Sequence, residues 1–282
     1  MKILTFDIED WFHILDNDST RSSRQWNSFE SRIHMNMERI FDILRRTQTK
    51  ATFFCLGWIA KTYPGVIRDI ANRGFDVASH SHLHQLIYQQ KPHEFARDLE
   101  YSLKILEDIT GKKVNYFRAP GFSIRETNKW AFEIIASMGI LVDCSVFPAP
   151  RAHGGYTAYN KPVPSIIKYN GIELKELPIN YISVFGKPVI FTGGGYFRFF
   201  PYYLISNWTK QSDYLMSYLH PRDFDPDQPV IKELTLTRKF KSYTGLKGAA
   251  AKLELWLTEF EFTDVATATN NINWSKVPIV NI

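Results

Sequence analysis

The sequence of 282 residues has few cysteines and no long apolar run. The first shortage argues against a disulfide-stabilised protein, and the second argues against a membrane-spanning one. Its two cysteines, Cys55 and Cys144, each lie in an apolar stretch, where a buried free thiol is the ordinary state and a disulfide has no support. No stretch approaches the roughly 20 apolar residues of a membrane span, and an acidic residue follows the start too early for a signal peptide. We therefore expect a cytoplasmic chain, with attachment to the inner membrane surface left open.

The sequence also lacks the patterns of nucleophilic enzymes and of nucleic-acid binding. No Gly-x-Ser-x-Gly elbow occurs, and neither cysteine precedes a helix in an activating context. The formal net charge of +5 comes from 34 basic and 29 acidic residues that are spread along the chain. The short run Arg238–Lys241 is interpreted as solvated surface. We expect no nucleic-acid partner and no serine or cysteine nucleophile.

Short apolar runs alternate with amphipathic segments along most of the chain. Strands are predicted at residues 3–6, 51–56, 75–78, 114–118, 140–143, 172–178, 189–192 and 212–220. Helices are predicted at residues 36–46, 63–72, 92–110, 128–138 and 246–257. An irregular loop is expected at 148–164, and the glycines at 193–195 are expected to break the backbone. The alternation predicts one α/β domain with a barrel-like parallel sheet.

Three of the eight histidines fall within five residues, at His80, His82 and His84, and this cluster is the strongest chemical signal. In a turn or short helix, residues four apart share a face, so His80 and His84 would hold one metal ion with neutral imidazoles. In an extended segment His82 would join them. A polar loop with surface histidines is the alternative.

Three carboxylates, Asp7, Glu9 and Asp10, follow the first predicted strand. Acidic groups at the end of a buried strand are costly unless they bind a cation or take protons. Two imidazoles and a carboxylate with one open position suit hydrolytic zinc or a similar divalent ion.

In their order, these motifs resemble the polysaccharide deacetylases of carbohydrate esterase family four, which share the NodB homology domain. The motifs that carry the resemblance are Thr5–Asp10, Ala51–Phe54, His80–His84, Arg118–Gly121, Asp143 before Cys144–Pro148, and Leu219–Pro221. The resemblance covers about Ile3 to Pro226. Two further segments, Gly193–Tyr202 and Leu253–Phe262, resemble the branch found in exopolysaccharide and O-antigen gene clusters, which carries a C-terminal extension.

This resemblance implies a distorted (β/α)7-type barrel over residues 1–235 and a C-terminal extension over residues 236–282 packed on the same domain. It also implies one bound divalent ion, with Zn²⁺ as the expected metal. The expected partner is an amino-sugar-containing glycan or its lipid-linked precursor. The oligomeric state is not indicated.

The resemblance also implies roles for single residues. Asp7 corresponds to the catalytic base, Arg118 to the arginine that pairs with it and holds it ionised, and His220 to the general acid. Asp143 matches the fourth motif, and a carboxylate such as Asp143 beside His220 would raise the pKa of that imidazole into the working range.

The metal ligands implied are His80, His84 and a carboxylate of the first motif. The family usually has two adjacent aspartates there, whereas Ile8 follows Asp7 in this chain, so either Glu9 or Asp10 remains a candidate. We slightly favour Glu9, which leaves Asp10 to bond nearby backbone or Trp11. The residues expected at the substrate are Trp11, Pro120, Phe122 and Tyr196, whose rings would contact sugars.

The function predicted is metal-dependent removal of an acyl group, expected to be acetyl, from an amino sugar of a bacterial polysaccharide or its precursor. One alternative keeps the site and changes the bond, as in a sugar deformylase or another hydrolase of non-peptide C–N bonds. A second alternative is a non-catalytic carbohydrate-binding relative.

Overall fold

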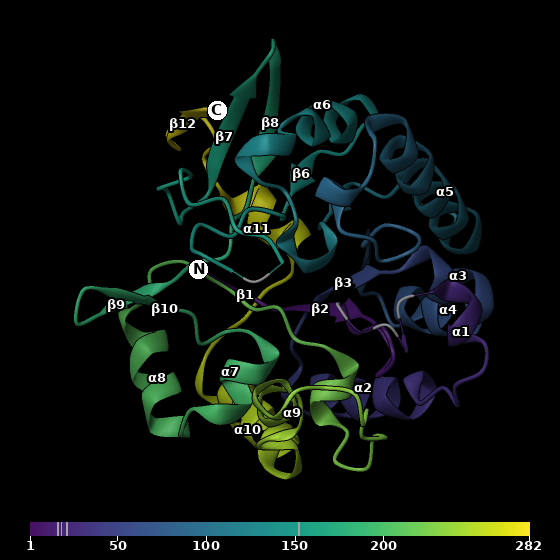
Figure 1. Cartoon of the computed structure of the whole chain (residues 1–282). Coiled ribbons are helices and arrows are strands. Elements are labelled where there is room, and N and C mark those ends of the chain that lie inside the picture. Colours follow the sequence, from purple (N-terminus) through teal and green to yellow (C-terminus); the bar gives the residue numbers. More distant parts are fainter. Residues whose placement is uncertain (16, 18, 21, 152) are drawn as a thin grey trace.

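The computed structural model describes residues 1–15, 17, 19, 20, 22–151 and 153–282. Its centre is an eight-stranded sheet with the order β12-β7-β8-β6-β5-β4-β3-β2 (Figure 1). The strands are β2 (Thr5–Ile8), β3 (Thr52–Cys55), β4 (Asp76–Ser79), β5 (Tyr116–Phe117), β6 (Val142–Asp143), β7 (Ser165–Tyr169), β8 (Ile172–Glu176) and β12 (Ile279–Asn281).

Another parallel strand extends this sheet beyond β2. Strand β1 (Lys2–Ile3) pairs in parallel with β11 (Leu215–Met216), and a parallel bridge joins Phe6 to Leu219. With β1 and β2 counted as one strand, seven neighbouring strands run parallel, in the order β11, β1–β2, β3, β4, β5, β6 and β8. The predicted (β/α)7-type arrangement is confirmed.

Helices follow most of these strands along the chain and supply the predicted alternation. They are α1 (Ser23–Trp26), α2 (Ile33–Thr47), α3 (Gly57–Thr62), α4 (Pro64–Asn72), α5 (Pro92–Thr110), α6 (Trp130–Ser137), α7 (Gly194–Phe199), α8 (Tyr202–Gln211), α9 (Leu236–Tyr243), α10 (Leu246–Glu259) and α11 (Val265–Asn271). Apolar side chains of α2, such as Ile40 and Leu44, are almost fully buried. Their spacing of four residues places them on one face, which is why this segment packs as a helix.

Two predicted strands differ from the structure. Of residues 189–192, only Val189 is in a strand, because β10 (Lys187–Val189) forms an antiparallel hairpin with β9 (Ile182–Val184). Within 212–220 the regular strand is limited to β11, since Leu219 forms only an isolated bridge. The expected loop at 148–164 has neither helix nor strand among its described residues, and residue 152 lies outside them.

The glycine run was expected to break the backbone, but it begins helix α7. Gly193 is the N-terminal cap and Gly194 is the first helical residue. A Cβ atom on Gly193 would lie 1.9 Å from the Tyr218 ring, and one on Gly194 would lie 2.0 Å from Asp223 Oδ2. The glycines therefore allow close packing between α7 and the loop after β11.

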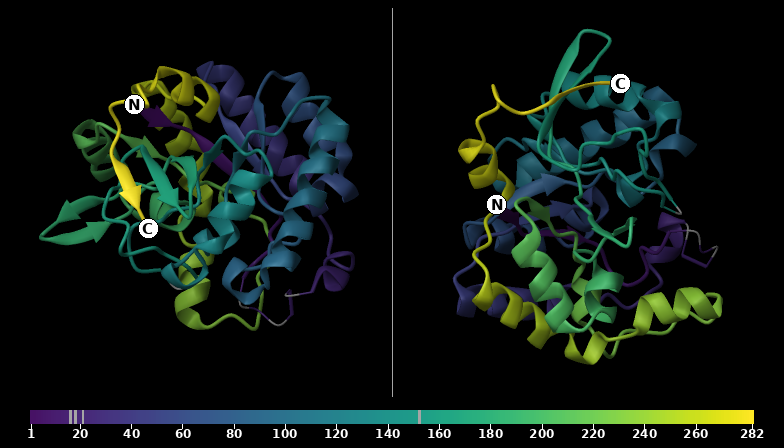
Figure 2. Two further views of the ribbon diagram at one scale, coloured as in Figure 1. Left: turned by 90° about the horizontal axis from the view of Figure 1, so that it is seen from above. Right: turned by 90° about the vertical axis from the view of Figure 1, so that its left-hand side faces the viewer.

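Residues 236–282 pack against the barrel at several places. Trp256 of α10 is fully buried, and its indole nitrogen donates to Thr209 Oγ1 of α8 at 2.9 Å. Strand β12 pairs with β7, while α9 projects from the body (Figure 2). The boundary at 235 stays a prediction. No helix among the described residues has the length and apolar character needed to cross a membrane.

Candidate metal and acid–base site

The polar residues of the first motif separate at the end of β2. Asp7 and Glu9 line a pocket of about 220 Å³, whereas Asp10 turns away from it. Asp10 accepts hydrogen bonds from the amides of Trp11 at 2.8 Å and Arg32 at 3.0 Å, and from Ser31 Oγ at 2.5 Å. Asp10 thus fixes the backbone just before α2 begins. Of the two candidate ligands, Glu9 is therefore the one that lies in the pocket.

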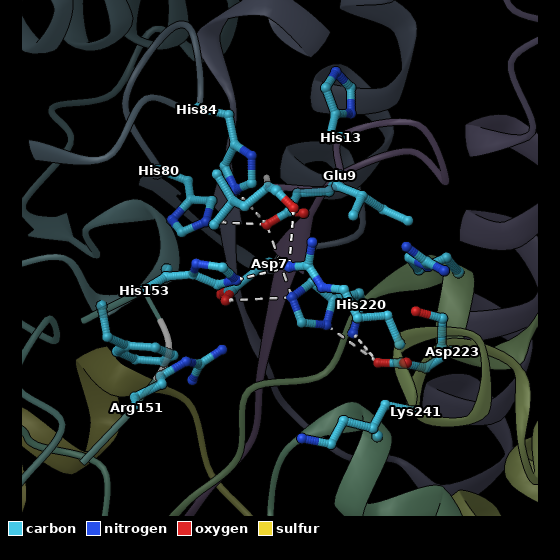
Figure 3. A pocket seen from close by; sticks show the side chains of 18 of the residues that line it. Asp7, Glu9, His13, His80, His84, Arg151, His153, His220, Asp223 and Lys241 are labelled. Atoms are coloured by element: carbon cyan, nitrogen blue, oxygen red, sulfur yellow. Dashed lines mark hydrogen bonds and ion pairs between the residues drawn. The ribbon is translucent and has the colours of Figure 1, made fainter. Parts of the chain in front are cut away.

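Glu9 lies between two histidines of the loop after β4 (Figure 3). Its Oε1 is 3.2 Å from His80 Nε2 and 2.9 Å from His84 Nε2. Burial alone would raise the pKa of Glu9, but the charges of His84 and His220 and the hydrogen bonds from His80 and His84 lower it well below the usual value. Glu9 is therefore a buried, ionised carboxylate that can act as a metal ligand.

The donor set fits a divalent cation. His80 Nδ1 lies 2.8 Å from the carbonyl oxygen of Arg118, so a proton on Nδ1 leaves the Nε2 lone pair free. His84 Nε2 is also buried and faces the same Glu9 oxygen. Tetrahedral zinc ligands with bonds of about 2.0–2.1 Å are about 3.3 Å apart, close to the separations found here. Glu9, His80 and His84 are thus the residues that would hold the ion.

His82, which would join the two other histidines in an extended segment, faces away from them. Its ring packs 4.4 Å from that of Tyr101, and its amide donates to Asp98 Oδ2 at 2.7 Å. Burial lowers the pKa of His82 to about 4. The loop is neither helical nor extended, because Ser81 and His84 have positive φ angles of 67° and 53°. These turns direct His80 and His84 inward and His82 outward.

Asp7 forms a buried ion pair with Arg118, which follows β5. Arg118 Nη1 is 2.6 Å from Asp7 Oδ1, and the same nitrogen donates to Thr5 Oγ1 at 2.7 Å. The guanidinium carbon lies 4.1 Å above the Phe54 ring. Because Arg118 is fully buried, its orientation is determined by the packing around it.

His220 follows β11 and completes the site. Its Nε2 lies 3.9 Å from Asp7 Oδ2 and 3.8 Å from Glu9 Oε1. Burial would lower the pKa of His220, but the charge of Glu9 together with the hydrogen bond and charge of Asp223 raises it to about 9. With this pKa, His220 is an imidazolium at neutral pH.

The carboxylate beside His220 is Asp223, and the expectation for Asp143 is wrong. Asp223 Oδ2 is 3.2 Å from His220 Nδ1 and accepts the His220 amide at 2.8 Å. Asp143 accepts from Ser145 Oγ at 2.6 Å and is paired in register with Glu176. Burial raises the pKa of Asp143 to about 6. Asp143 is fully buried within β6, whereas Asp223 is in the turn that begins at His220.

Of the four expected substrate residues, only Phe122 lines the pocket. Trp11 is 6% exposed and packs against Phe12 and Phe29. Tyr196 is 46% exposed and stacks on Phe200, outside the lining. Pro120 is buried in a turn before Phe122. These three placements correct the expectation, since an aromatic near a motif is often used for packing.

Several pocket residues were missed from the sequence: His13, Arg151, Arg198, Arg222, Asp223 and Lys241. For Asp223 a signal existed, because proline one residue after His220 and an acid two residues later are typical of a helical turn. His13 Nδ1 accepts the Asp10 amide at 2.8 Å, while its Nε2 is buried without a partner. No sequence pattern indicated the remaining cations.

An α/β barrel with a His/His/carboxylate cluster beside an ion-paired aspartate and a further histidine is typical of hydrolases that use a single metal ion. A family model for polysaccharide deacetylases matches residues 17–141, and a domain of unknown function, DUF3473, matches residues 144–270. Residues 17–141 therefore belong to the polysaccharide deacetylase family. Asp7 and Glu9 precede the first matched range, and His220 lies in the second.

Two curated relatives align with parts of the chain. A peptidoglycan-N-acetylglucosamine deacetylase of Bacillus cereus is 31% identical over 96 residues, which are 34% of this chain and 35% of that protein. A chitooligosaccharide deacetylase of Azorhizobium caulinodans is 33% identical over 82 residues, 29% of this chain and 39% of that protein. The aligned part thus spans between a third and two fifths of the relatives' length.

Among solved structures, a polysaccharide deacetylase homologue from Mycobacterium smegmatis has the same fold. Its TM-score is 0.65 at 17% sequence identity, and the match covers 98% of this chain and 90% of that one. The likeness extends over the whole barrel and the C-terminal helices.

Proposed function

We propose that this protein is a metal-dependent N-deacetylase that hydrolyses the acetamide of an N-acetylated amino sugar. The observation that carries the proposal is the convergence of Asp7 and His220 on the Glu9, His80 and His84 cluster, with His220 Nε2 within 3.9 Å of carboxylate oxygens of both Asp7 and Glu9. A base and an acid thus border the same small space.

Amide hydrolysis needs an activated water, a stabilised oxyanion and a protonated leaving nitrogen. A divalent ion at Glu9, His80 and His84, for which zinc is our choice, would supply Lewis acidity to the carbonyl and the water. Asp7, oriented by Arg118, accepts the proton of the attacking water. His220 donates its Nε2 proton to the departing nitrogen, and Asp223 stabilises the imidazolium before that step.

The names of the relatives support an amino-sugar substrate, since one is a peptidoglycan-N-acetylglucosamine deacetylase and the other a chitooligosaccharide deacetylase. We propose a bacterial polysaccharide or its lipid-linked precursor as the substrate of this chain, as in exopolysaccharide synthesis. Formamide hydrolysis and carbohydrate binding without catalysis are the competing functions.

The test measures metal content and acyl release together. Purified wild-type protein should retain one divalent ion and release acetate, rather than formate or ammonia, from N-acetylated oligosaccharides. His80→Ala should lose the ion, whereas Asp7→Asn should keep it and lose turnover.

His82→Ala is the matched control, because this histidine belongs to the same loop but packs on Tyr101. It should keep both the ion and the activity. A wild-type protein that binds glycans but neither retains a divalent ion nor releases an acyl group would instead support the carbohydrate-binding function.

A further inference from the structure

The pocket contains more positive charge than the proposed reaction uses. Arg151, Arg222 and Lys241 line it beside the acid–base residues. Within the part of the chain that the structure describes, none of the three forms an ion pair with a carboxylate. Arg198 differs, because its Nε lies 3.1 Å from Asp223 Oδ1 and its other nitrogens donate to main-chain carbonyls.

Arg151 is held in place by aromatic rings rather than by a counter-ion. Its guanidinium carbon lies 4.8 Å from the centre of the Phe122 ring, 5.0 Å from that of Phe147 and 5.3 Å from that of Tyr218. Such rings stabilise the cation through its faces and leave the in-plane N–H groups available. Arg151 Nη1 is buried and has no hydrogen-bond partner among the described residues, although the same side chain shares a hydrogen bond with Tyr218.

Arg222 has a similar unfilled donor on another wall of the pocket. Among the residues that the structure describes, its Nη2 is buried without a partner and its Nη1 makes only a long hydrogen bond of 3.4 Å to the carbonyl oxygen of Trp11. A buried donor without an acceptor is destabilising, and more so when it is charged. Two such donors facing one pocket indicate a ligand that supplies acceptors.

The acids of the pocket cannot supply these acceptors, because each already has partners. Asp7 pairs with Arg118, Asp223 with Arg198 and His220, and Glu9 with His80 and His84. A metal ion at Glu9 would add further positive charge. An anionic ligand in the pocket would supply the missing acceptors.

We propose that the substrate carries an anionic group, a carboxylate or a phosphoryl group, which binds between Arg151, Arg222 and Lys241 while the amide lies at the metal site. Planar guanidinium groups match both kinds of anion through paired N–H donors. A uronic acid residue in the glycan or a phosphate on the amino sugar would each provide the group. This inference rests on the proposed deacetylase function.

The kinetic test compares three substrates with the metal-loaded enzyme: neutral N,N′-diacetylchitobiose, N-acetylglucosamine 1-phosphate, and a disaccharide of glucuronic acid and N-acetylglucosamine. The enzyme should have a higher kcat/KM for one or both anionic substrates. The preferred substrate shows whether the anionic group is a phosphate or a carboxylate. Arg151→Gln should raise KM for the favoured substrate about tenfold, because one charge-assisted contact is lost. Its kcat should change less than threefold, and turnover of the neutral substrate should be unaffected.

Lys241→Gln is a second variant. Because the Lys241 side chain is exposed, its replacement is not expected to disturb folding, so a change in KM reports on binding. Arg125→Gln is the matched control, since Arg125 also lies over an aromatic ring, 3.6 Å from the Tyr88 centroid, but outside the pocket lining. Equal turnover of neutral and charged substrates, or an equal loss on both in Arg151→Gln, would overturn the proposal.

A binding measurement separates this inference from the proposed function. Calorimetry of chelator-treated protein with inorganic diphosphate and with glucuronate should show binding of at least one anion, weakened about tenfold in Arg151→Gln and unchanged in Arg125→Gln. Anion binding without any acyl release would remove the deacetylase function and keep the anion site. Acyl release without anion binding would keep the deacetylase function and remove the anion site.

Discussion

Arg118 and Asp7, 111 residues apart in the chain, form an ion pair of 2.6 Å that is almost completely shielded from solvent. Asp7 is the next-to-last residue of β2 and lines the pocket, and Arg118 reaches it from just after β5, three strands away in the sheet. Because both groups are buried, each depends on the other for its charge to be tolerated.

This dependence leads to a stability prediction. Arg118→Met should lower the free energy of unfolding by about 3–5 kcal/mol, since it leaves a buried carboxylate unpaired. In the double variant Arg118→Met/Asp7→Asn the loss should be clearly smaller than the sum of the single losses. Urea denaturation of the four proteins measures the coupling, and simple additivity would show that the pair contributes no interaction energy.

The pKa of His220 should depend on Asp223 and not on Asp143. In metal-free protein, NMR titration should give a His220 pKa of about 9, against an ordinary value of 6.5. Asp223→Asn should lower it by about one unit or more, because the nearest negative charge is lost. Asp143→Asn should leave it unchanged. A shift in the Asp143 variant alone would favour the sequence-based expectation.

The same pKa shift predicts a pH dependence of stability. The folded pKa of His220 is raised above the unfolded value, so its contribution is complete below pH 6.5 and is lost as the pH rises towards 9. Metal-free wild-type protein should become less stable across this range, and Asp223→Asn should show a smaller change. Thermal melts from pH 6 to 9.5 measure the difference. Parallel curves for the two proteins would contradict this assignment.

Glu9 and Asp10 should behave differently although they are adjacent. Glu9→Gln should lose the divalent ion, because the amide is a poor replacement for the carboxylate between His80 and His84. Asp10→Ala should retain the ion and lose about 1–3 kcal/mol of stability, since the bonds to Ser31 and Arg32 disappear. Metal analysis with denaturation separates the two effects, and loss of metal in Asp10→Ala with normal folding would reverse the assignment.

Gly194 should not tolerate a methyl group. In Gly194→Ala the new Cβ would lie 2.0 Å from Asp223 Oδ2, so the turn that holds His220 must move and turnover should fall at least tenfold. Gly248→Ala is the control within α10, where a Cβ meets nothing within 4 Å. It should stabilise the protein by up to about 1 kcal/mol with activity unchanged. Wild-type activity in Gly194→Ala would show that the turn adapts.

Local patterns were sufficient for most of the barrel. Regular apolar spacing identified α2 and α5, and continuous apolar runs identified β2 and β3, because these segments bury one face or both faces along their whole length. The region after residue 178 was less predictable. There the chain forms short strands such as β11, whose two residues pair with β1 rather than following any periodicity of their own.

The sequence by itself determined the parallel α/β architecture and indicated Asp7, His80 and His84, with Glu9 and Asp10 both as candidate ligands, while Arg118 and His220 were named through the family resemblance. It did so because repeating apolar patterns and closely spaced ligands are local properties of a chain. Only the tertiary structure decided that Glu9 rather than Asp10 faces the histidines, that Asp223 rather than Asp143 contacts His220, and that Arg151 and Lys241 line the pocket. These choices depend on side-chain direction and on contacts between distant segments, which no local pattern encodes.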